Sequence, residues 1–175
     1  MKNYIKFILL MLIIAAFYSC DTTIEENVGT SIPKTSFDNR LWSADLEDSI
    51  YTKSATYISV YPKIYSYRTQ TKYHLSSTIY MRNPSIKDTL IVSKISAYSS
   101  SGVLDLQILE SPIFIAPLET VSFNLDDKIG TTKDDYALTL DWHCRNKSIE
   151  PLVECIMISA SGLHGISFIT KGQRM

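Results

Sequence analysis

The feature that most constrains the fold is a period-two alternation of apolar and polar side chains, which runs through the chain from Tyr57 onward. In the segment 74–82, the odd-numbered positions carry Leu, Ser, Ile and Met, whereas the even-numbered positions carry His, Ser, Thr, Tyr and Arg. Successive side chains of a strand point to opposite faces of a sheet, so this pattern predicts a strand with one buried face. Similar patterns predict strands over 57–61, 90–98, 104–108, 113–115, 121–126, 136–143 and 166–170.

Turn residues separate these short segments, and amphipathic helical periodicity is almost absent from the same region. The segment Leu152–Ala160 is apolar at odd and even positions, which predicts a central strand covered on both faces. Several prolines lie at strand starts or corners, where no ladder hydrogen bond is lost. They are Pro62, Pro84, Pro112, Pro117 and Pro151. The pattern predicts an all-β fold: a single antiparallel immunoglobulin-like β-sandwich of about 7–9 strands.

The N-terminal segment has the organisation of a secretory signal. Lys2 and Lys6 precede an apolar run, Phe7–Phe17, which is shorter than the roughly 20 residues of a membrane-spanning helix. Ser19 lies directly before Cys20, the residue that lipoprotein processing would acylate. The strict lipoprotein box has Leu where this chain has Phe17, and looser boxes that end in Ser-Cys resemble those of Bacteroidetes lipoproteins. An uncleaved signal anchor and a secreted protein with a free cysteine are the alternatives.

These signals divide the chain into three parts. Residues 1–19 are predicted to be the lipoprotein signal peptide, 20–50 a lipidated flexible tether with a short flap, and 51–175 the β-sandwich domain. Ser43 is a candidate cap for a short helix over 44–49 in the flap. We expect the protein to lie in the bacterial cell envelope, attached to a membrane through lipidated Cys20. The outer membrane is the expected membrane, and the domain would lie on its periplasmic or its surface face.

The charge of the chain argues against nucleic acid as a partner. The formal net charge is −1, and removal of Lys2 and Lys6 with the signal makes it about −3. A nucleic-acid-binding domain usually carries a basic stripe on one face, and the sequence has none.

Cys144 and Cys155 are the two cysteines that lipidation would leave. Disulfides are permitted in exported proteins, and a bridge between these two residues is one alternative. Buried free thiols are the other, which we favour, because neighbouring strands rarely place two cysteines with the geometry that a disulfide needs.

The sequence contains few patterns that carry chemistry. His74, His143 and His164 are not spaced with one another or with the cysteines as metal ligands are, so we expect no metal and no cofactor. A Gly-x-Ser-x-Gly elbow is absent. Glu154 lies within the most apolar predicted strand, where a buried charge requires a partner, and Arg82 and Arg174 are the candidates. We expect a structural ion pair in preference to a general acid or base.

Tyrosines are concentrated in the segment 51–80, which holds seven of the eleven. Tyrosine rings offer flat amphipathic surfaces to sugars and to proteins, so Tyr57, Tyr61 and Tyr65 form a candidate aromatic binding face. The alternative is that these residues are ordinary strand residues.

Several blocks of residues between Tyr57 and Arg174 match a pattern found in one bacterial family. The blocks are Tyr61-Pro62, Ile64-Tyr65, Leu75, Thr78-Ile79, Met81-Arg82-Asn83, Tyr98, Gly102, Leu104, Pro117-Leu118, Thr120, Pro151, Val153-Glu154, Ile156-Met157-Ile158, Gly165-Ile-Ser-Phe168 and Gly172. This part of the chain resembles domain of unknown function 3124, which often occurs in exported or lipid-anchored proteins. The resemblance implies no activity and no ligand. The pattern includes Glu154 and does not require the two cysteines.

From these features we expect a non-enzymatic binding or scaffolding domain whose partner is an envelope protein, because sandwiches offer edge strands to which a peptide can add. A carbohydrate-binding module that uses the clustered tyrosines is the second hypothesis. An envelope hydrolase centred on Glu154, with His164, is the third.

Overall fold

A computed structural model describes residues 37–43, 51–65, 72–125, 135–159 and 165–175, all of which belong to one compact unit, Lys34–Met175. The described residues form one short 3₁₀ helix and twelve strands. The helix is η1 (Asp38–Arg40), and the strands are β1 (Thr52–Val60), β2 (Lys63–Tyr65), β3 (Lys72–His74), β4 (Ser76–Arg82), β5 (Leu90–Ser99), β6 (Leu104–Leu109), β7 (Ile113–Ile115), β8 (Thr120–Asn124), β9 (Tyr136–Cys144), β10 (Leu152–Ser159), β11 (Ile166–Lys171) and β12 (Gln173–Arg174).

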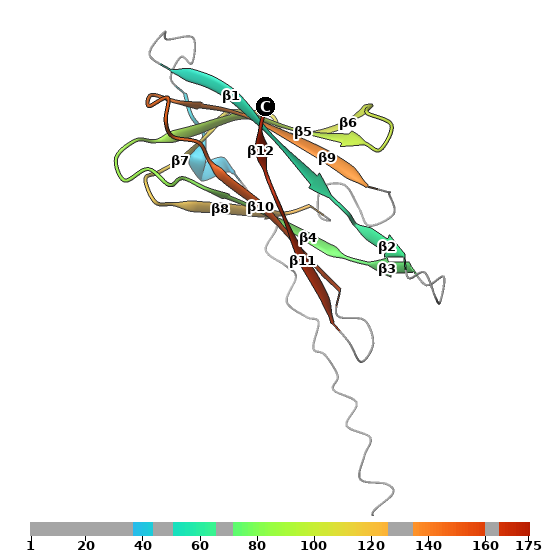
Figure 1. Cartoon of the computed structure of the whole chain (residues 1–175). Coiled ribbons are helices and arrows are strands. Elements are labelled where there is room, and N and C mark those ends of the chain that lie inside the picture. The colour runs from blue at the N-terminus through green and yellow to red at the C-terminus, as the bar shows by residue number, and fades with distance from the viewer. Residues whose placement is uncertain (1–36, 44–50, 66–71, 126–134, 160–164) are drawn as a thin grey trace, which may run out of the picture. The chain divides into compact units, whose positions relative to one another are not determined.

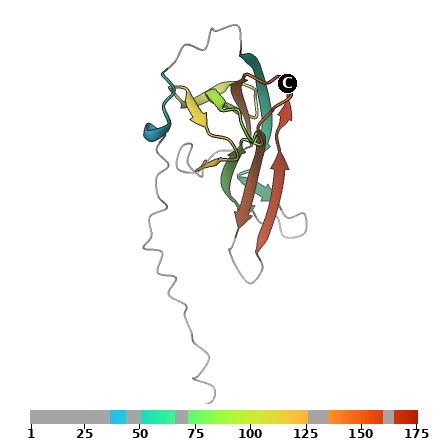
Figure 2. The same ribbon diagram turned by 90° about the vertical axis from the view of Figure 1, so that its left-hand side faces the viewer.

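Two antiparallel sheets form the layers of the domain (Figure 1). The six-stranded sheet has the order β12-β1-β9-β5-β6, and β7 pairs with β5 outside this path. The four-stranded sheet has the order β11-β10-β4-β8, and β2 and β3 form a separate small ribbon. Figure 2 shows β10 and β11 side by side along one side of the sandwich. The predicted antiparallel β-sandwich is confirmed, and the strands beyond the expected number are pieces of two or three residues.

The core lies between the two sheets and follows the predicted alternation. Leu75, Ile79 and Met81 are buried, as are Leu138 and Leu140 from the opposite sheet. Apolar side chains on facing strands exclude water only if they share one side of each sheet, so the hydrophobic effect fixes the register of both sheets. One polar contact within the core joins two neighbouring strands: the Trp142 indole N–H donates a hydrogen bond of 3.0 Å to Thr56 Oγ1.

One face of β10 is open to solvent, which corrects the prediction that this strand is covered on both sides. Val153, Cys155 and Met157 are buried, whereas Leu152 and Ile158 are 53% and 50% exposed. A continuous apolar run does not by itself show that a second layer covers the strand. Here the four-stranded sheet is one outer layer of the sandwich, so its outward side chains are apolar without being covered.

The alternation predicted over 104–108 is also interrupted. Leu104 pairs with Tyr98, Leu106 with Ala97 and Leu109 with Ile95, with register shifts between these pairs. A β-bulge places an extra residue in one strand and reverses the faces of the residues that follow it. As a result, Leu104 is exposed and Leu109 is buried.

A glycine allows the chain to cross from one sheet to the other between β11 and β12. A Cβ atom on Gly172 would lie 2.6 Å from Thr56 Cγ2 and 3.0 Å from Val153 Cβ. The Gly172 N–H donates a 2.8 Å hydrogen bond to the Val153 carbonyl. Because the backbone of β12 must approach both sheets this closely, any side chain at this position would displace one of them.

Residues 37–43 pack against the sandwich ahead of β1. The Phe37 and Phe123 rings are 6.0 Å apart in an edge-to-face arrangement. Arg40 Nη1 lies 2.6 Å from Glu119 Oε1, and the Ala116 N–H donates to Glu119 Oε2 at 2.8 Å. Burial would raise the pKa of Glu119, but the Ala116 N–H and the Arg40 guanidinium outweigh it and hold that pKa below its usual value. The short helix predicted over 44–49 lies outside the described residues.

Candidate functional site

The outermost strand of the four-stranded sheet, β11, presents an open backbone edge. The Gly172 N–H bonds to the Val153 carbonyl, so the pair Val153/Gly172 is a hydrogen-bonded pair. Hydrogen-bonded and non-hydrogen-bonded pairs alternate along an antiparallel ladder. The register therefore directs the backbone groups of Ser167, Ile169 and Lys171 away from β10, toward the open edge.

An exposed apolar surface adjoins this edge. Ile169 is 56% exposed and pairs directly with Ile156, which is partly buried on the outward face of β10. Ile158 lies two residues further along β10 on the same face. Together these three isoleucines form an apolar strip across two strands, which we call the outer strip.

Glu154 and Arg82 lie on this same face, where the sequence predicted an ion pair. Arg82 Nε is 3.8 Å from Glu154 Oε2. Arg82, one of the two candidate partners, thus lies within ion-pair distance of Glu154, but the pair is not buried, because the Glu154 side chain is 31% exposed. An exposed pair at this distance contributes little to stability. The other candidate partner, Arg174, pairs instead with Glu150 at 3.7 Å.

Two of the three predicted tyrosines share one cavity. Tyr57 and Tyr61 line a cavity of about 270 Å³ together with Ser59, Thr170, Lys171 and Gln173. It lies where β12 ends and β1 continues beside β11. Thr170 Oγ1 donates a 2.7 Å hydrogen bond to the Ser59 carbonyl, and Ser59 Oγ donates to the Tyr57 hydroxyl at 3.3 Å. The cavity therefore offers hydroxyl groups and two partly exposed phenol rings.

Tyr61 is held in place by contacts with β10 and β11. Its ring centroid lies 6.3 Å from that of Phe168, and its backbone N–H donates to Met157 Sδ at 3.2 Å. Tyr65 does not line this cavity: it lies on the β2–β3 ribbon, with Lys72 Nζ 5.6 Å from its ring centroid. Tyr65 therefore lies outside the cavity that Tyr57 and Tyr61 share.

Both cysteines of the described region are buried thiols. Cys144 ends β9 in the six-stranded sheet, whereas Cys155 lies on β10 in the four-stranded sheet. Burial raises the pKa of the Cys144 thiol. The structure thus has two buried thiols and not a disulfide, as we favoured. The two cysteines lie in different sheets, whereas the sequence suggested neighbouring strands of one sheet.

The histidines are dispersed. His143 Nε2 lies 3.0 Å from Ser93 Oγ, and burial together with the charge of Lys53 lowers the pKa of His143. His74 is exposed at the end of β3, and His164 lies outside the described residues. In the part of the chain that the structure describes, no three His, Cys, Asp or Glu side chains gather as a metal site would require.

The predictions for the N-terminal segment fall outside the described residues. They concern the signal peptide over 1–19, the lipidation of Cys20 and the tether that follows. Within the ranges that are described, no helix has the length and hydrophobicity to cross a membrane.

Sequence reasoning missed the open edge of β11. The run Ile166–Thr170 contains neither proline nor a charged residue, so its composition gave no sign of an edge position. Natural edge strands usually carry one of these to prevent pairing with another chain.

Comparison with known proteins identifies a family. The family model described as "Protein of unknown function (DUF3124)" matches residues 53–175. No curated protein matches the chain. A similar solved structure, "Crystal Structure of Thermotoga maritima 1070", is 14% identical, with a TM-score of 0.43 over 69% of this chain and 92% of that chain. The family match extends from β1 to the C-terminus and confirms the resemblance seen in the sequence blocks. The chain thus belongs to the DUF3124 family of proteins of unknown function.

Proposed function

We propose that this protein is a lipid-anchored, non-enzymatic domain of the bacterial cell envelope that binds an extended segment of a protein partner along β11. The open backbone edge of Ser167, Ile169 and Lys171 is the observation that carries the proposal. An added strand would form hydrogen bonds with these groups in the same pattern as a strand of the sheet. The partner segment would have an apolar residue near Ile169, because the outer strip adjoins the edge there.

The other sheet edges suit strand addition less well. β8 has only five residues, β12 has two, and the ladder of β6 is interrupted by register shifts. β11 offers six residues, and its single charge, Lys171, stands at its end. A regular edge of this length gives a partner the longest continuous ladder.

Proline substitutions on β11 test the proposal together with its register. Ile169→Pro removes an N–H that faces the open edge, so the fold should persist while strand addition is blocked. Phe168→Pro removes an N–H that pairs with β10 and should destabilise the domain. Comparable destabilisation by the two substitutions, measured by urea unfolding, would refute the register.

Cross-linking in intact cells tests the partner. A photoreactive amino acid at Ser167 should give one defined cross-linked protein, and Ile169→Pro should abolish that product. The same amino acid at Val103, in the turn between β5 and β6, is the control and should not give it. A product at Ser167 that is unchanged by Ile169→Pro would contradict strand addition.

The membrane anchor is supported by the signal-like segment and by Cys20. Mass spectrometry of the mature N-terminus should identify acylated Cys20, and Cys20→Ala should release the protein from the membrane. An intact Met1 in the mature protein would refute the anchor.

Saccharide binding is a second candidate function, favoured by the presence of Tyr57 and Tyr61 in one cavity. A cavity of about 270 Å³ lined by hydroxyl groups and phenol rings suits a single sugar ring. Binding on a glycan array should disappear with Tyr57→Ala and Tyr61→Ala and persist with Tyr65→Ala, because Tyr65 lies outside the cavity. Equal loss with all three variants would argue against this site.

An envelope hydrolase centred on Glu154 remains a hypothesis that no contact in the described structure favours over binding. Glu154→Gln should leave the fold intact, because the pair with Arg82 is exposed. Loss of a measured turnover in that folded variant would support the hydrolase.

A further inference from the structure

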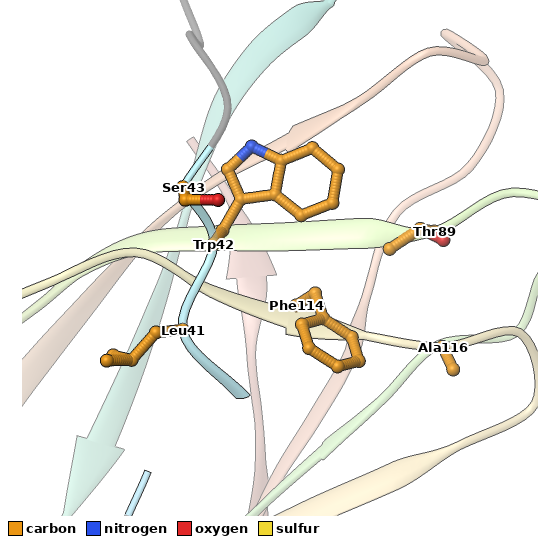
Figure 3. A pocket seen from close by; sticks show the side chains of 6 residues that line it. All are labelled: Leu41, Trp42, Ser43, Thr89, Phe114 and Ala116. Carbon is orange, nitrogen blue, oxygen red and sulfur yellow. The ribbon is translucent and has the colours of Figure 1, made fainter. Parts of the chain in front are cut away.

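Three large aliphatic side chains are exposed on the segments that adjoin η1, β7 and the loop between β4 and β5. Figure 1 shows η1 and β7 close together at one end of the sandwich. Leu41, Ile86 and Leu118 are 53%, 72% and 68% exposed. The Leu118 N–H donates a 3.0 Å hydrogen bond to the carbonyl of Ser85, the residue before Ile86. Leu41 pairs with Ile113 across an isolated bridge at the start of β7. It lines a mostly apolar cavity of about 460 Å³, with Ala116 on the opposite side and Phe114 between them (Figure 3). We call these three residues the tip patch.

Asn83 fixes the backbone beneath the tip patch. This residue is 1% exposed, and its Nδ2 lies 2.8, 2.9 and 3.1 Å from the carbonyl oxygens of Asp88, Ile115 and Ala116. Its Oδ1 accepts a 3.0 Å hydrogen bond from the Ser85 N–H. One buried amide therefore joins the loop that carries Ile86 to the turn that carries Leu118, so the exposure of the two side chains is built into the fold.

Leu118 has a backbone conformation that residues other than glycine rarely adopt. Its φ is +61°, and it follows Pro117 in a turn closed by a 3.1 Å hydrogen bond from the Glu119 N–H to the Ala116 carbonyl. Proline followed by a residue of positive φ is the pattern of a type II turn, where glycine or asparagine is favoured. Core packing does not account for a strained leucine that is mostly exposed. Strain of this kind is often retained for function.

The connection to Cys20 enters the domain beside the tip patch. Sixteen residues, 21–36, separate Cys20 from Phe37, and Arg40 and Leu41 follow directly. Arg40 pairs with Glu119 in the turn that carries Leu118. A chain of sixteen residues spans at most about 55 Å, so a membrane that holds Cys20 is within reach of this end of the domain.

We propose that the tip patch inserts into the lipid surface to which Cys20 is attached. The inference rests on the anchor proposed above and not on strand addition. Exposed aliphatic side chains on rigid loops transfer favourably from water to the acyl region of a membrane. The tip patch would supply a second contact and set the orientation of the domain, with the opposite end of β5 directed away from the membrane.

Site-specific labelling of the full lipidated chain in vesicles tests this proposal. Leu118→Cys and Val103→Cys are labelled with an environment-sensitive fluorophore after reconstitution into phosphatidylethanolamine and phosphatidylglycerol. Val103 is the matched control, since it is 64% exposed and lies beyond the other end of β5. The buried native thiols Cys144 and Cys155 should not label in the folded protein. An unchanged urea midpoint verifies that each variant is folded.

The label at position 118 should shift to shorter emission wavelength and be quenched by spin-labelled lipid, and the label at 103 should be quenched by aqueous iodide. If the chain co-floats with the vesicles but iodide alone quenches both labels, the tip proposal is wrong and the membrane anchor is supported. A label at 118 that is shielded from iodide and from spin-labelled lipid would indicate a protein contact and would also overturn the proposal. If the chain does not float, both the anchor and the tip contact are refuted.

Discussion

Replacement of Asn83 by alanine should be among the most damaging single substitutions in the domain. The side chain is buried, and its amide serves the loop between β4 and β5 and the turn between β7 and β8. Alanine would leave the Ser85 N–H and the carbonyls of Asp88, Ile115 and Ala116 without this partner. Water cannot readily replace the amide, because the site is enclosed.

The magnitude follows from the hydrogen bonds. The amide can donate two full bonds, shared among three carbonyls, and accept one from Ser85. A buried hydrogen bond contributes about 1 kcal/mol net, so the loss is about 3 kcal/mol. Domains of this size are stable by roughly 5–15 kcal/mol, so the variant should fold with reduced stability. With a urea m-value of about 2 kcal/mol/M, the unfolding midpoint should fall by about 1.5 M.

Asn146→Ala is the control for this experiment. Asn146 also accepts a 3.0 Å hydrogen bond from the N–H two residues ahead, that of Ser148, but it is exposed. We expect a change of less than about 1 kcal/mol there, since water replaces the lost contact. A destabilisation by Asn83→Ala that is no larger than that of Asn146→Ala would refute the role assigned to Asn83.

Three further predictions concern individual residues. Gly172→Ala should destabilise the domain by about 2 kcal/mol in urea unfolding, because the new methyl group would collide with Thr56 and Val153; an unchanged midpoint would contradict the crossing geometry. Leu118→Gly should raise the unfolding free energy by about 1 kcal/mol, since glycine relieves the strain of a positive φ, and a lower midpoint would show that Leu118 is not strained. Because the pKa of His143 is lowered, the unfolded chain binds its proton more readily than the folded chain. The contribution of neutral His143 to the unfolding free energy should therefore be fully present above about pH 6.5 and be lost as the pH falls through that value toward the folded pKa. His143→Gln should abolish this part of the pH dependence. An unchanged pH profile in that variant would exclude His143 as its source.

The sequence predicted most of the sandwich because burial imposes a period on each strand. The inward residues of β4, β8 and β9 were identified correctly from alternation alone. The strand β10 was interpreted wrongly, because an apolar residue does not reveal whether another layer covers it. The bulges of β6 were also missed, since an extra residue leaves no mark in composition.

The candidate sites were only partly predictable. The cost of an isolated charge in an apolar strand suggested Arg82 or Arg174 as a partner of Glu154; Arg82 lies 3.8 Å away, in an exposed pair. Tyr57 and Tyr61 share a cavity but Tyr65 does not, because their grouping depends on where β12 ends beside β1. Spacing along the chain does not contain that information.

The sequence by itself determined the class of fold and the signal-like N-terminus, since both follow from local patterns of hydrophobicity and charge. The tertiary structure decided which strand is left at the edge of its sheet and which loops meet at the end of the sandwich. The open edge of β11 depends on a hydrogen-bond register set by Gly172 and Val153. The tip patch depends on Asn83, which joins segments more than thirty residues apart. Contacts between distant segments are fixed only when the whole core packs, which is why they do not appear in any local stretch of sequence.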